Sequence, residues 1–265
     1  MSTINIIKVN ATRSTNNKVK VLIKSKKIIS GDIVSAKYQY GGRGQLTNRW
    51  YSSYGKNLLC SLYFEFPKIS PDLGFSINYA VCLSVLKTIR KFVPDQTIIK
   101  WPNDILSGDK KISGILIENT LRSNKIHSSI IGTGININQI LFKNSLNAIS
   151  LKKLSNNEFS VNVVLDELIN NYKFYLSKIS NVEELSKDYH KNLYGLNGCD
   201  FLLGGKKVKG KVIKVLNNGQ IKVDIESLGI ANYSYGDRTR ININFPPLYS
   251  PNISKGFVYF VLFKA

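Results

Sequence analysis

Two long segments with apolar residues at helical spacing place the strongest constraint on what this chain can fold into. In residues 75–92 the apolar side chains recur on one side, and Pro94 ends the pattern. The second segment, residues 161–176, keeps the same period and follows Ser160, a residue type suited to a helix N-cap. A helix with one apolar stripe must bury it, so we expect both segments to pack on a sheet.

Apolar and aromatic runs typical of β-strands lie on both sides of the first long helix. They cover residues 33–38, 58–66, 97–101, 112–117 and 126–137. Shorter helices are expected at residues 16–23 and, from the capping pair Asn181 and Glu184, near residue 182. This part of the chain is therefore predicted to be α+β, with helices packed on a mixed sheet.

The pattern changes near Gly195. From Asp200 onward, short alternating strands are separated by turns rich in glycine and asparagine, which favours a small barrel of four or five antiparallel strands. We therefore divide the chain into a larger domain, residues 1–195, a small β-barrel domain, residues 196–250, and a tail or last strand, residues 251–265.

The composition bounds the partners and the compartment. The 265 residues carry 37 lysines and arginines against 17 acids, a formal charge of +20. That charge suits a nucleic-acid partner, but the lysines are spread along the whole chain beside many asparagines and isoleucines, which biased codon usage also produces. The three cysteines are scattered, and no segment resembles a signal peptide or a membrane span. We expect a cytoplasmic protein without a membrane partner.

Short runs of glycine and polar residues stand at the ends of the expected strands. The first, residues 41–44, surrounds Arg43 with three glycines, so the backbone can approach a ligand while the guanidinium binds a phosphate or carboxylate. An ordinary turn explains the same glycines. Another run, residues 132–138, combines small residues with the amides of Asn136 and Asn138. A strand that ends in an asparagine-capped turn explains it equally well.

Residues 100–116 are expected to form a hairpin around a turn at Gly108. In a two-residue hairpin Leu106 pairs with Lys111 and Asp104 pairs with Ser113, which brings Asp104 within reach of the Lys111 side chain. A plain surface ion pair is the alternative. Further along, a glycine at position 114 interrupts an apolar strand, either because a ligand approaches there or because the strand has a bulge.

Taken together and in this order, these runs resemble the biotin–protein ligases. The matching pieces are Ser14-Thr15-Asn16, Tyr38-Gln39, Gly42-Arg43-Gly44, Trp50, residues 55–58, KWPND at 100–104, KISGIL at 111–116 with Glu118, and GTGININ at 132–138. The resemblance implies the class II synthetase-like catalytic fold of biotin and lipoate ligases, followed by an SH3-like β-barrel. It also implies the reaction: ATP converts biotin to biotinyl-5'-AMP with release of pyrophosphate, and biotin then passes to a lysine of an acceptor protein.

The resemblance assigns site residues by position. Biotin is implied to contact Ser14, Thr15, Asn16, Gln39, Gly42, Arg43, Gly44, Gln45, Lys111 and Gly114. ATP is implied to contact Arg43, Trp50, Lys100, Asn103, Lys111 and Asn136, although Trp50 is also plausible as a core residue. The catalytic residues are implied to be Lys111, Arg43 and Asp104. An ammonium at Lys111 would stabilise charge on the α-phosphate, with Mg²⁺ neutralising the pyrophosphate, and Asp104 would either receive the acceptor amine or position Lys111.

The resemblance has one departure and several implications for partners. Many members carry an arginine where this chain has Gln45, so retention of the adenylate is expected to be weaker, with Arg49 as a partial substitute. The acceptor is implied to be the biotin carboxyl carrier domain of a carboxylase. Because the chain begins almost at Ser14, we expect no helix-turn-helix domain and no DNA binding. The sequence leaves a homodimer open.

Two rival functions remain at this stage. Lipoate–protein ligases and octanoyltransferases resemble the same fold and use a lysine on the equivalent strand, but the runs at residues 100–104 and 111–116 favour biotin. The other rival is a basic RNA-binding module in which Tyr233 and Tyr235 stack bases. That hypothesis leaves residues 39–138 unexplained.

Overall fold

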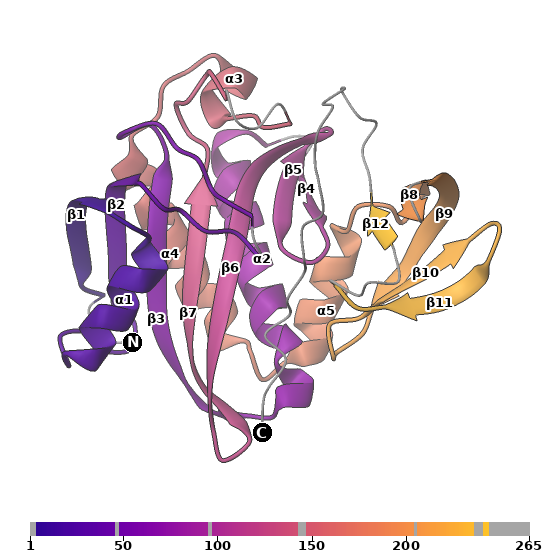
Figure 1. The fold of residues 1–265 in the computed structure, drawn as a ribbon, viewed down its shortest axis with the longest axis horizontal. Helices are drawn as coiled ribbons and strands as arrows, with labels where there is room; N and C mark the ends of the chain where they lie inside the picture. Colours follow the sequence, from indigo (N-terminus) through magenta and orange to yellow (C-terminus); the bar gives the residue numbers. More distant parts are fainter. Residues whose placement is uncertain are drawn as a thin grey trace.

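The computed structural model describes residues 4–45, 48–94, 97–142, 147–203, 206–235 and 241–243. Seven strands form one mixed sheet in the order β1-β2-β3-β7-β6-β5-β4 (Figure 1). Their bounds in that order are Ile6–Thr12, Ile33–Gln39, Leu58–Ile69, Lys125–Ile135, Lys110–Arg122, Asp104–Ser107 and Thr97–Lys100. The pair β1–β2 is parallel and the other pairs are antiparallel. The expected α+β class and mixed sheet are confirmed, and β1 is an addition.

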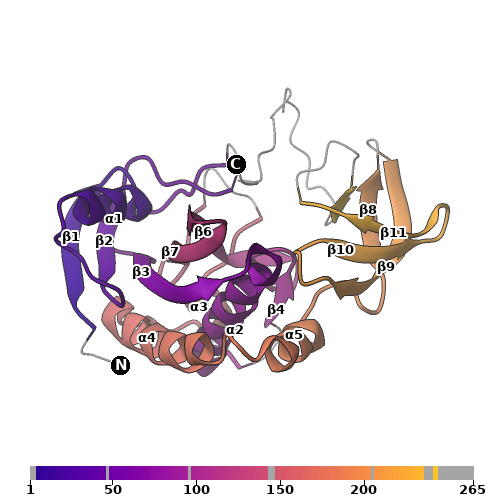
Figure 2. The same cartoon turned by 90° about the horizontal axis from the view of Figure 1, so that it is seen from below.

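Helices cover the two faces of this sheet unequally. The bounds are Thr15–Lys24 for α1, Phe75–Phe92 for α2, Leu151–Ser155 for α3, Val161–Ser177 for α4 and Val182–Lys191 for α5, with a 3₁₀ turn at Pro71–Leu73. Figure 2 shows α2, α4 and α5 together below the sheet, while α1 lies on the opposite side. The main hydrophobic core lies under α2 and α4, and a small cluster around Val19, Val34 and Tyr63 lies under α1. The face of the sheet that carries α1 is thus only partly covered by helix.

Both long helices occur where their periodicity predicts them. The predicted N-caps differ in detail. At α5 the Asn181 side chain accepts a hydrogen bond from the Glu184 backbone N–H at 3.2 Å, as the capping pair predicts. Ser160 occupies the N-cap of α4 but makes no side-chain capping bond. Since packing of the apolar stripe contributes most of a helix's stability in a protein, α4 forms without that bond.

The hairpin between β5 and β6 differs from the expected register by one bulge. Gly108 has a φ of +58°, which suits a tight turn, and Leu106 pairs with Lys111 as predicted. Asp104, however, pairs with Gly114 and not with Ser113, because the register shifts between Ile105 and Leu106. The extra residue, Ile112, is fully buried in the core. Burying this side chain brings Lys111 round to the same side of β6 as Gly114.

The C-terminal part forms a separate antiparallel sheet in the order β11-β10-β9-β8-β12. Its strands are Cys199–Leu203, Lys206–Val215, Ile221–Ile225, Gly229–Tyr233 and Ile241–Ile243 for β8 to β12. Five strands agree with the sequence, but no pairing between β11 and β12 closes the sheet within the residues described, so a barrel is not confirmed. The predicted tail, residues 251–265, lies outside the described residues.

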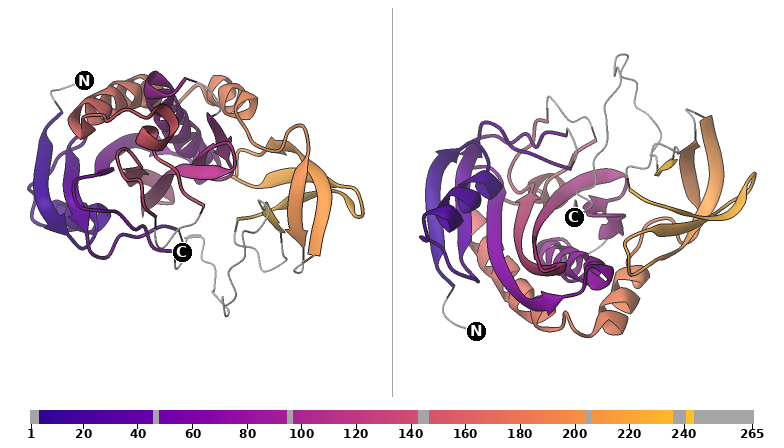
Figure 3. Two further views of the ribbon diagram at one scale, coloured as in Figure 1. Left: turned by 90° about the horizontal axis from the view of Figure 1, so that it is seen from above. Right: turned by 60° about the horizontal axis from the view of Figure 1, so that its bottom comes forward.

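The C-terminal sheet lies beyond β4 and α5, at one end of the large sheet (Figure 3). The indole Nε1 of Trp101 donates a hydrogen bond to the Gly219 carbonyl at 3.1 Å, and the backbone N–H of Val215 donates to His190 Nε2 at 2.6 Å. The two parts are therefore in direct contact. Among the described helices, none is long and apolar enough to cross a membrane.

Candidate functional site

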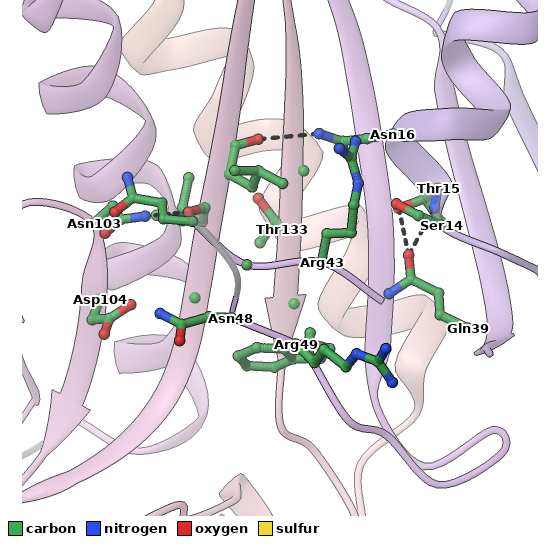
Figure 4. A pocket seen from close by; sticks show the side chains of 18 of the residues that line it. Ser14, Thr15, Asn16, Gln39, Arg43, Asn48, Arg49, Asn103, Asp104 and Thr133 are labelled. Carbon is green, nitrogen blue, oxygen red and sulfur yellow. Dashed lines mark hydrogen bonds between the residues drawn. The ribbon is translucent and has the colours of Figure 1, made fainter. Parts of the chain in front are cut away.

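A cavity of about 90 Å³ lies against β6 and β7 on the side away from α2 and α4. The structure brings together here most of the residues that the sequence singles out: Ser14, Thr15, Asn16, Gln39, Arg43, Gly44, Gln45, Trp50, Asn103, Asp104, Lys111 and Gly114. Figure 4 shows Asn103 and Asp104 on one side of the cavity and Thr15 and Gln39 on the other. We call these the Lys111 end and the Asn16 end.

The Asn16 end is a network of neutral hydrogen bonds. Thr15 donates from its backbone N–H and its hydroxyl to Gln39 Oε1, at 2.7 and 3.1 Å. The Ser61 hydroxyl lies 2.7 Å from Thr15 Oγ1 and 2.6 Å from Asn16 Oδ1. Every member but Gln39 is buried. Fixed amides and hydroxyls of this kind provide both donors and acceptors for a polar, uncharged group such as a urea.

A carboxylate closes the network at this end. Glu118 accepts a hydrogen bond from Asn16 Nδ2 at 2.8 Å and forms ion pairs with Lys20, at 2.8 Å, and Arg43, at 3.1 Å. The sequence includes Glu118 in a matching run but gives it no role. The Arg43 guanidinium is thus held at the Asn16 end, as Figure 4 also shows.

The Lys111 end is built around one ion pair. Lys111 Nζ lies 2.6 Å from Asp104 Oδ1, and the two side chains are 35% and 27% exposed. The predicted proximity of these two residues is therefore confirmed, although it arises through a different register. The amide of Asn103 donates to the Ile115 carbonyl, and the backbone of Lys111 is bonded to Asn147 and Ile149 on its outer side. The lysine therefore projects from a well-fixed backbone.

Trp50 lies flat against two glycines in the middle of the cavity. A Cβ at Gly114 would approach Trp50 Cζ3 to 2.9 Å, and one at Gly134 would approach Cε2 to 2.5 Å. Close approach of this indole explains why neither position carries a side chain. Among the described residues the indole Nε1 is buried without a hydrogen-bond partner, and so is Oε1 of Gln45. Buried unsatisfied groups of this kind are rare unless something else binds them.

A second cavity, of about 540 Å³, adjoins the first and shares Gln39, Trp50 and Lys111 with it. Gly42 and Asn136, the remaining glycine and amide that the sequence assigns, line this cavity. Asn136 also fixes the backbone at Ile149, because its Nδ2 donates a hydrogen bond to the Ile149 carbonyl at 3.0 Å. Pockets for small ligands usually measure about 300–1,000 Å³. The volume of the second cavity is in that range, whereas the first cavity is narrowed by the Trp50 side chain.

Lys100 is the one assigned residue that lines neither cavity. It pairs with Asp104 across β4 and β5, and burial lowers the pKa of its ammonium, against the opposing effect of the Asp104 charge. Lys100 therefore lies beside Asp104 on the edge strand β4, one strand farther from the cavities.

Tyr235 is the cavity residue that comes from farthest along the chain. Its ring packs edge-on against Trp101 at 5.6 Å, and burial, followed by the charge of Asp104, raises the pKa of its hydroxyl to about 12. The sequence treats Tyr235 as a residue that could stack on RNA bases. A partly buried ring at the Lys111 end is not exposed for stacking on bases. The alternation of residues along the strand does not predict that Tyr235 lines the cavity.

Residues 9–136, which contain most of this site, match the model of the biotin/lipoate A/B protein ligase family. The chain thus carries a domain of this family. Among curated relatives, the bifunctional ligase/repressor BirA of Escherichia coli is 33% identical over 108 residues, 41% of this chain and 33% of that protein. The matched region spans about a third of the length of the first of these relatives.

Other relatives match more of the chain at lower identity. The biotin–[acetyl-CoA-carboxylase] ligase of Mycobacterium tuberculosis is 24% identical over 220 residues, which is 81% of each protein. The biotin protein ligase of Aquifex aeolicus, solved in complex with biotin and ATP, superposes with a TM-score of 0.71 at 24% identity. That match covers 90% of this chain and 97% of the other. The fold, including the C-terminal sheet, is therefore one that occurs in biotin protein ligases.

Proposed function

We propose that this protein is a biotin–protein ligase, which activates biotin with ATP and transfers it to a lysine of a biotin carboxyl carrier domain. The observation that carries the proposal is that Lys111 lines both cavities. The other end of the narrow cavity, the Asn16 end, carries amides and hydroxyls that suit a urea. The names of the relatives support the same substrate. ATP would occupy the larger cavity, and biotin would occupy the narrow cavity once the Trp50 indole moves.

In the first step an oxygen of the biotin carboxylate attacks the α-phosphorus of ATP. The bond from that phosphorus to the bridging oxygen breaks, and pyrophosphate leaves. Two anions must approach and charge grows on the phosphoryl oxygens, so a fixed ammonium at Lys111 lowers the barrier. Asp104, at 2.6 Å, orients that ammonium. Arg43 would leave Glu118 and then bind the biotin carboxylate or the α-phosphate.

Mg²⁺ fits this site as a partner of the nucleotide. Among the described residues no three acids, histidines or cysteines gather as a metal site. Phosphate oxygens and water would therefore provide most of its ligands, with Asn136 at the edge of the larger cavity as an amide ligand. When bound there, Mg²⁺ supplies charge neutralisation for the departing pyrophosphate.

In the second step the acceptor lysine, as a neutral amine, attacks the carbonyl carbon of biotinyl-5'-AMP. An amide forms and AMP leaves. Asp104 lies at the Lys111 end, where the amine must enter, and it is 27% exposed on its side chain. We assign it to orient the amine and to accept its proton, in addition to positioning Lys111.

We extend the proposal to the finer features of the molecule. Residues 1–195 would form the catalytic domain and residues 196–250 a small SH3-like barrel, of which the described strands make an open sheet. The protein would act in the cytoplasm on a carboxylase. Homodimer formation and the absence of DNA binding stay predictions from the sequence.

The test is incorporation of labelled biotin into a purified carrier domain. We expect label only with ATP and magnesium present, and no label when the acceptor lysine is replaced by arginine. Lipoate is the competitor to include, because the family model covers lipoate ligases as well. Efficient incorporation of lipoate in place of biotin would contradict the substrate, and no ATP-dependent acylation of any kind would contradict the class of enzyme.

A further inference from the structure

Glu118 has more partners than any other acid at the site. It accepts hydrogen bonds from Lys20 and Asn16, each at 2.8 Å, and from Arg43 Nη2, which lies 3.1 Å from both carboxylate oxygens. Three separate elements meet at this side chain: α1, the glycine-arginine loop and β6. It is therefore the junction between the Asn16 network and the Arg43 guanidinium.

The electrostatics of Glu118 show that it is held as a carboxylate. Partial burial by itself raises the pKa of this group, but the hydrogen bonds from Lys20 and Asn16 and the charge of Arg43 outweigh burial. The pKa lies below its ordinary value. A permanent negative charge is thus fixed beside the Arg43 guanidinium.

The position of Glu118 on β6 determines which end of the narrow cavity it controls. Because of the bulge at Ile112, the side chains of Lys111 and Glu118 lie on the same side of the strand, the side on which Gly114 leaves room. The Lys111 side chain extends along β6 as far as Gly114, because a Cβ at Gly114 would lie 3.1 Å from Lys111 Nζ. Gly114 is four positions before Glu118 in the sequence, which is about 13 Å along a strand. The guanidinium that contacts Glu118 is therefore beside a different part of β6 from the ammonium of Lys111, where the anionic part of the substrates would meet.

We propose that Glu118 is a positioning residue, which orients the Asn16 amide for the polar head of the ligand and holds Arg43 until the anionic part of the ligand takes it. This inference rests on the proposed function for the identity of the ligand. In the resting protein the carboxylate acts as a stand-in anion for Arg43. When biotin and ATP bind, Arg43 exchanges one anion for another, while Asn16 keeps its hydrogen bond to Glu118.

Two substitutions separate the two roles of Glu118, which are orienting Asn16 and holding Arg43. In Glu118→Gln the amide oxygen can still accept from Asn16, but the charge that holds Arg43 is lost. In Glu118→Ala both are lost. We expect Glu118→Gln to keep the KM for biotin within about twofold of the wild-type value and Glu118→Ala to raise it about tenfold, as loss of a hydrogen bond to a charged group predicts. The kcat of adenylate formation should change little in either variant.

The hold of Glu118 on Arg43 is measured without any ligand. The full-length protein is digested with trypsin, and mass spectrometry follows the rate of cleavage after Arg43. We expect cleavage several-fold faster in both variants than in the wild-type protein. The matched control is Glu184→Gln, which removes a carboxylate paired with Lys178 at 2.6 Å on α5, away from the cavity. It should change neither the cleavage rate nor the KM.

Wild-type protection of Arg43 in Glu118→Gln would overturn the proposal, and so would a fall in kcat without a rise in KM in Glu118→Ala. Equal effects of Glu184→Gln would show a general loss of stability and would also overturn it. If the wild-type protein fails to bind biotin, the proposed function falls alone, because the cleavage experiment still decides whether Glu118 holds Arg43.

Discussion

The two ends of the narrow cavity are built in different ways. At the Asn16 end, buried neutral groups bond to one another and to a single carboxylate, and nearly every donor has a partner. At the Lys111 end, one ion pair stands at partial exposure beside a larger cavity. Buried neutral networks fix geometry and give recognition, whereas an ammonium open to a cavity can meet a charge that develops during a reaction. Under the proposed function, recognition and chemistry would thus be separated between the two ends of the cavity.

The largest difference between the ends should appear with Lys111→Ala. We expect the rate of adenylate formation to fall by about 10²–10³-fold, the scale of losing one electrostatic stabiliser of a transition state. Biotin binding should change far less, because the urea-binding groups are untouched. Pyrophosphate release and biotin calorimetry measure the two quantities on one preparation. A loss of binding as large as the loss of rate would mean that the ends are not separate.

Between the ends, a methyl group at Gly134 tests the narrow cavity itself. In Gly134→Ala the new Cβ would lie 2.5 Å from Trp50 Cε2, so the indole must shift. We expect the dissociation constant of biotin to rise about tenfold, within the range that overpacking causes. Replacing Trp50 by leucine in the same chain should recover part of this loss. No recovery would show that the indole is not the obstructed group.

At the Asn16 end, Asn16→Ala should affect recognition alone. The substitution removes the amide that would contact the urea, together with its bonds to Ser61 and Glu118. We expect the KM for biotin to rise about tenfold, the scale of one lost hydrogen bond, with an unchanged kcat, in steady-state assays of adenylate formation. A drop in kcat with constant KM would place Asn16 in the chemical step.

The smallest expected effect is on the pH dependence of stability. The pKa of Glu118 is lower in the folded protein than in the unfolded chain, so its contribution is present above the unfolded value, about 4.3, and is lost as the pH falls through the folded value. The difference in melting temperature between wild type and Glu118→Gln should therefore be largest near neutral pH and shrink in acid. A constant difference across this range would contradict the ion pairs at Glu118.

Sequence patterns predict those parts of the molecule that local chemistry decides. The helical periods of residues 75–92 and 161–176 specify α2 and α4, and the glycine turn at position 108 specifies the hairpin that brings Asp104 to Lys111. Motif order also anticipates most of the residues that line the cavity. These features depend on spacing within a few residues.

The remaining features depend on contacts between distant segments. Ile112 enters the core and creates the bulge, Arg43 binds a carboxylate 75 positions away, and Tyr235 reaches the cavity from the C-terminal part. No local pattern shows any of these contacts. The strand β1 lacks a clear signal because its residues are half-buried or exposed. Lys100 is assigned to ATP by its place in a motif, whereas the fold places it beside Asp104 on the edge strand, outside both cavities.

The most direct test of the central claim is a crystal structure of the protein with biotin and an ATP analogue whose bridge between the α- and β-phosphates cannot be cleaved. The account predicts Lys111 Nζ at about 3 Å from both the biotin carboxylate and an α-phosphate oxygen, with the urea ring against Asn16. It also predicts that Arg43 has left Glu118. A complex in which biotin lies elsewhere, or in which Lys111 contacts only Asp104 and water, would contradict the account.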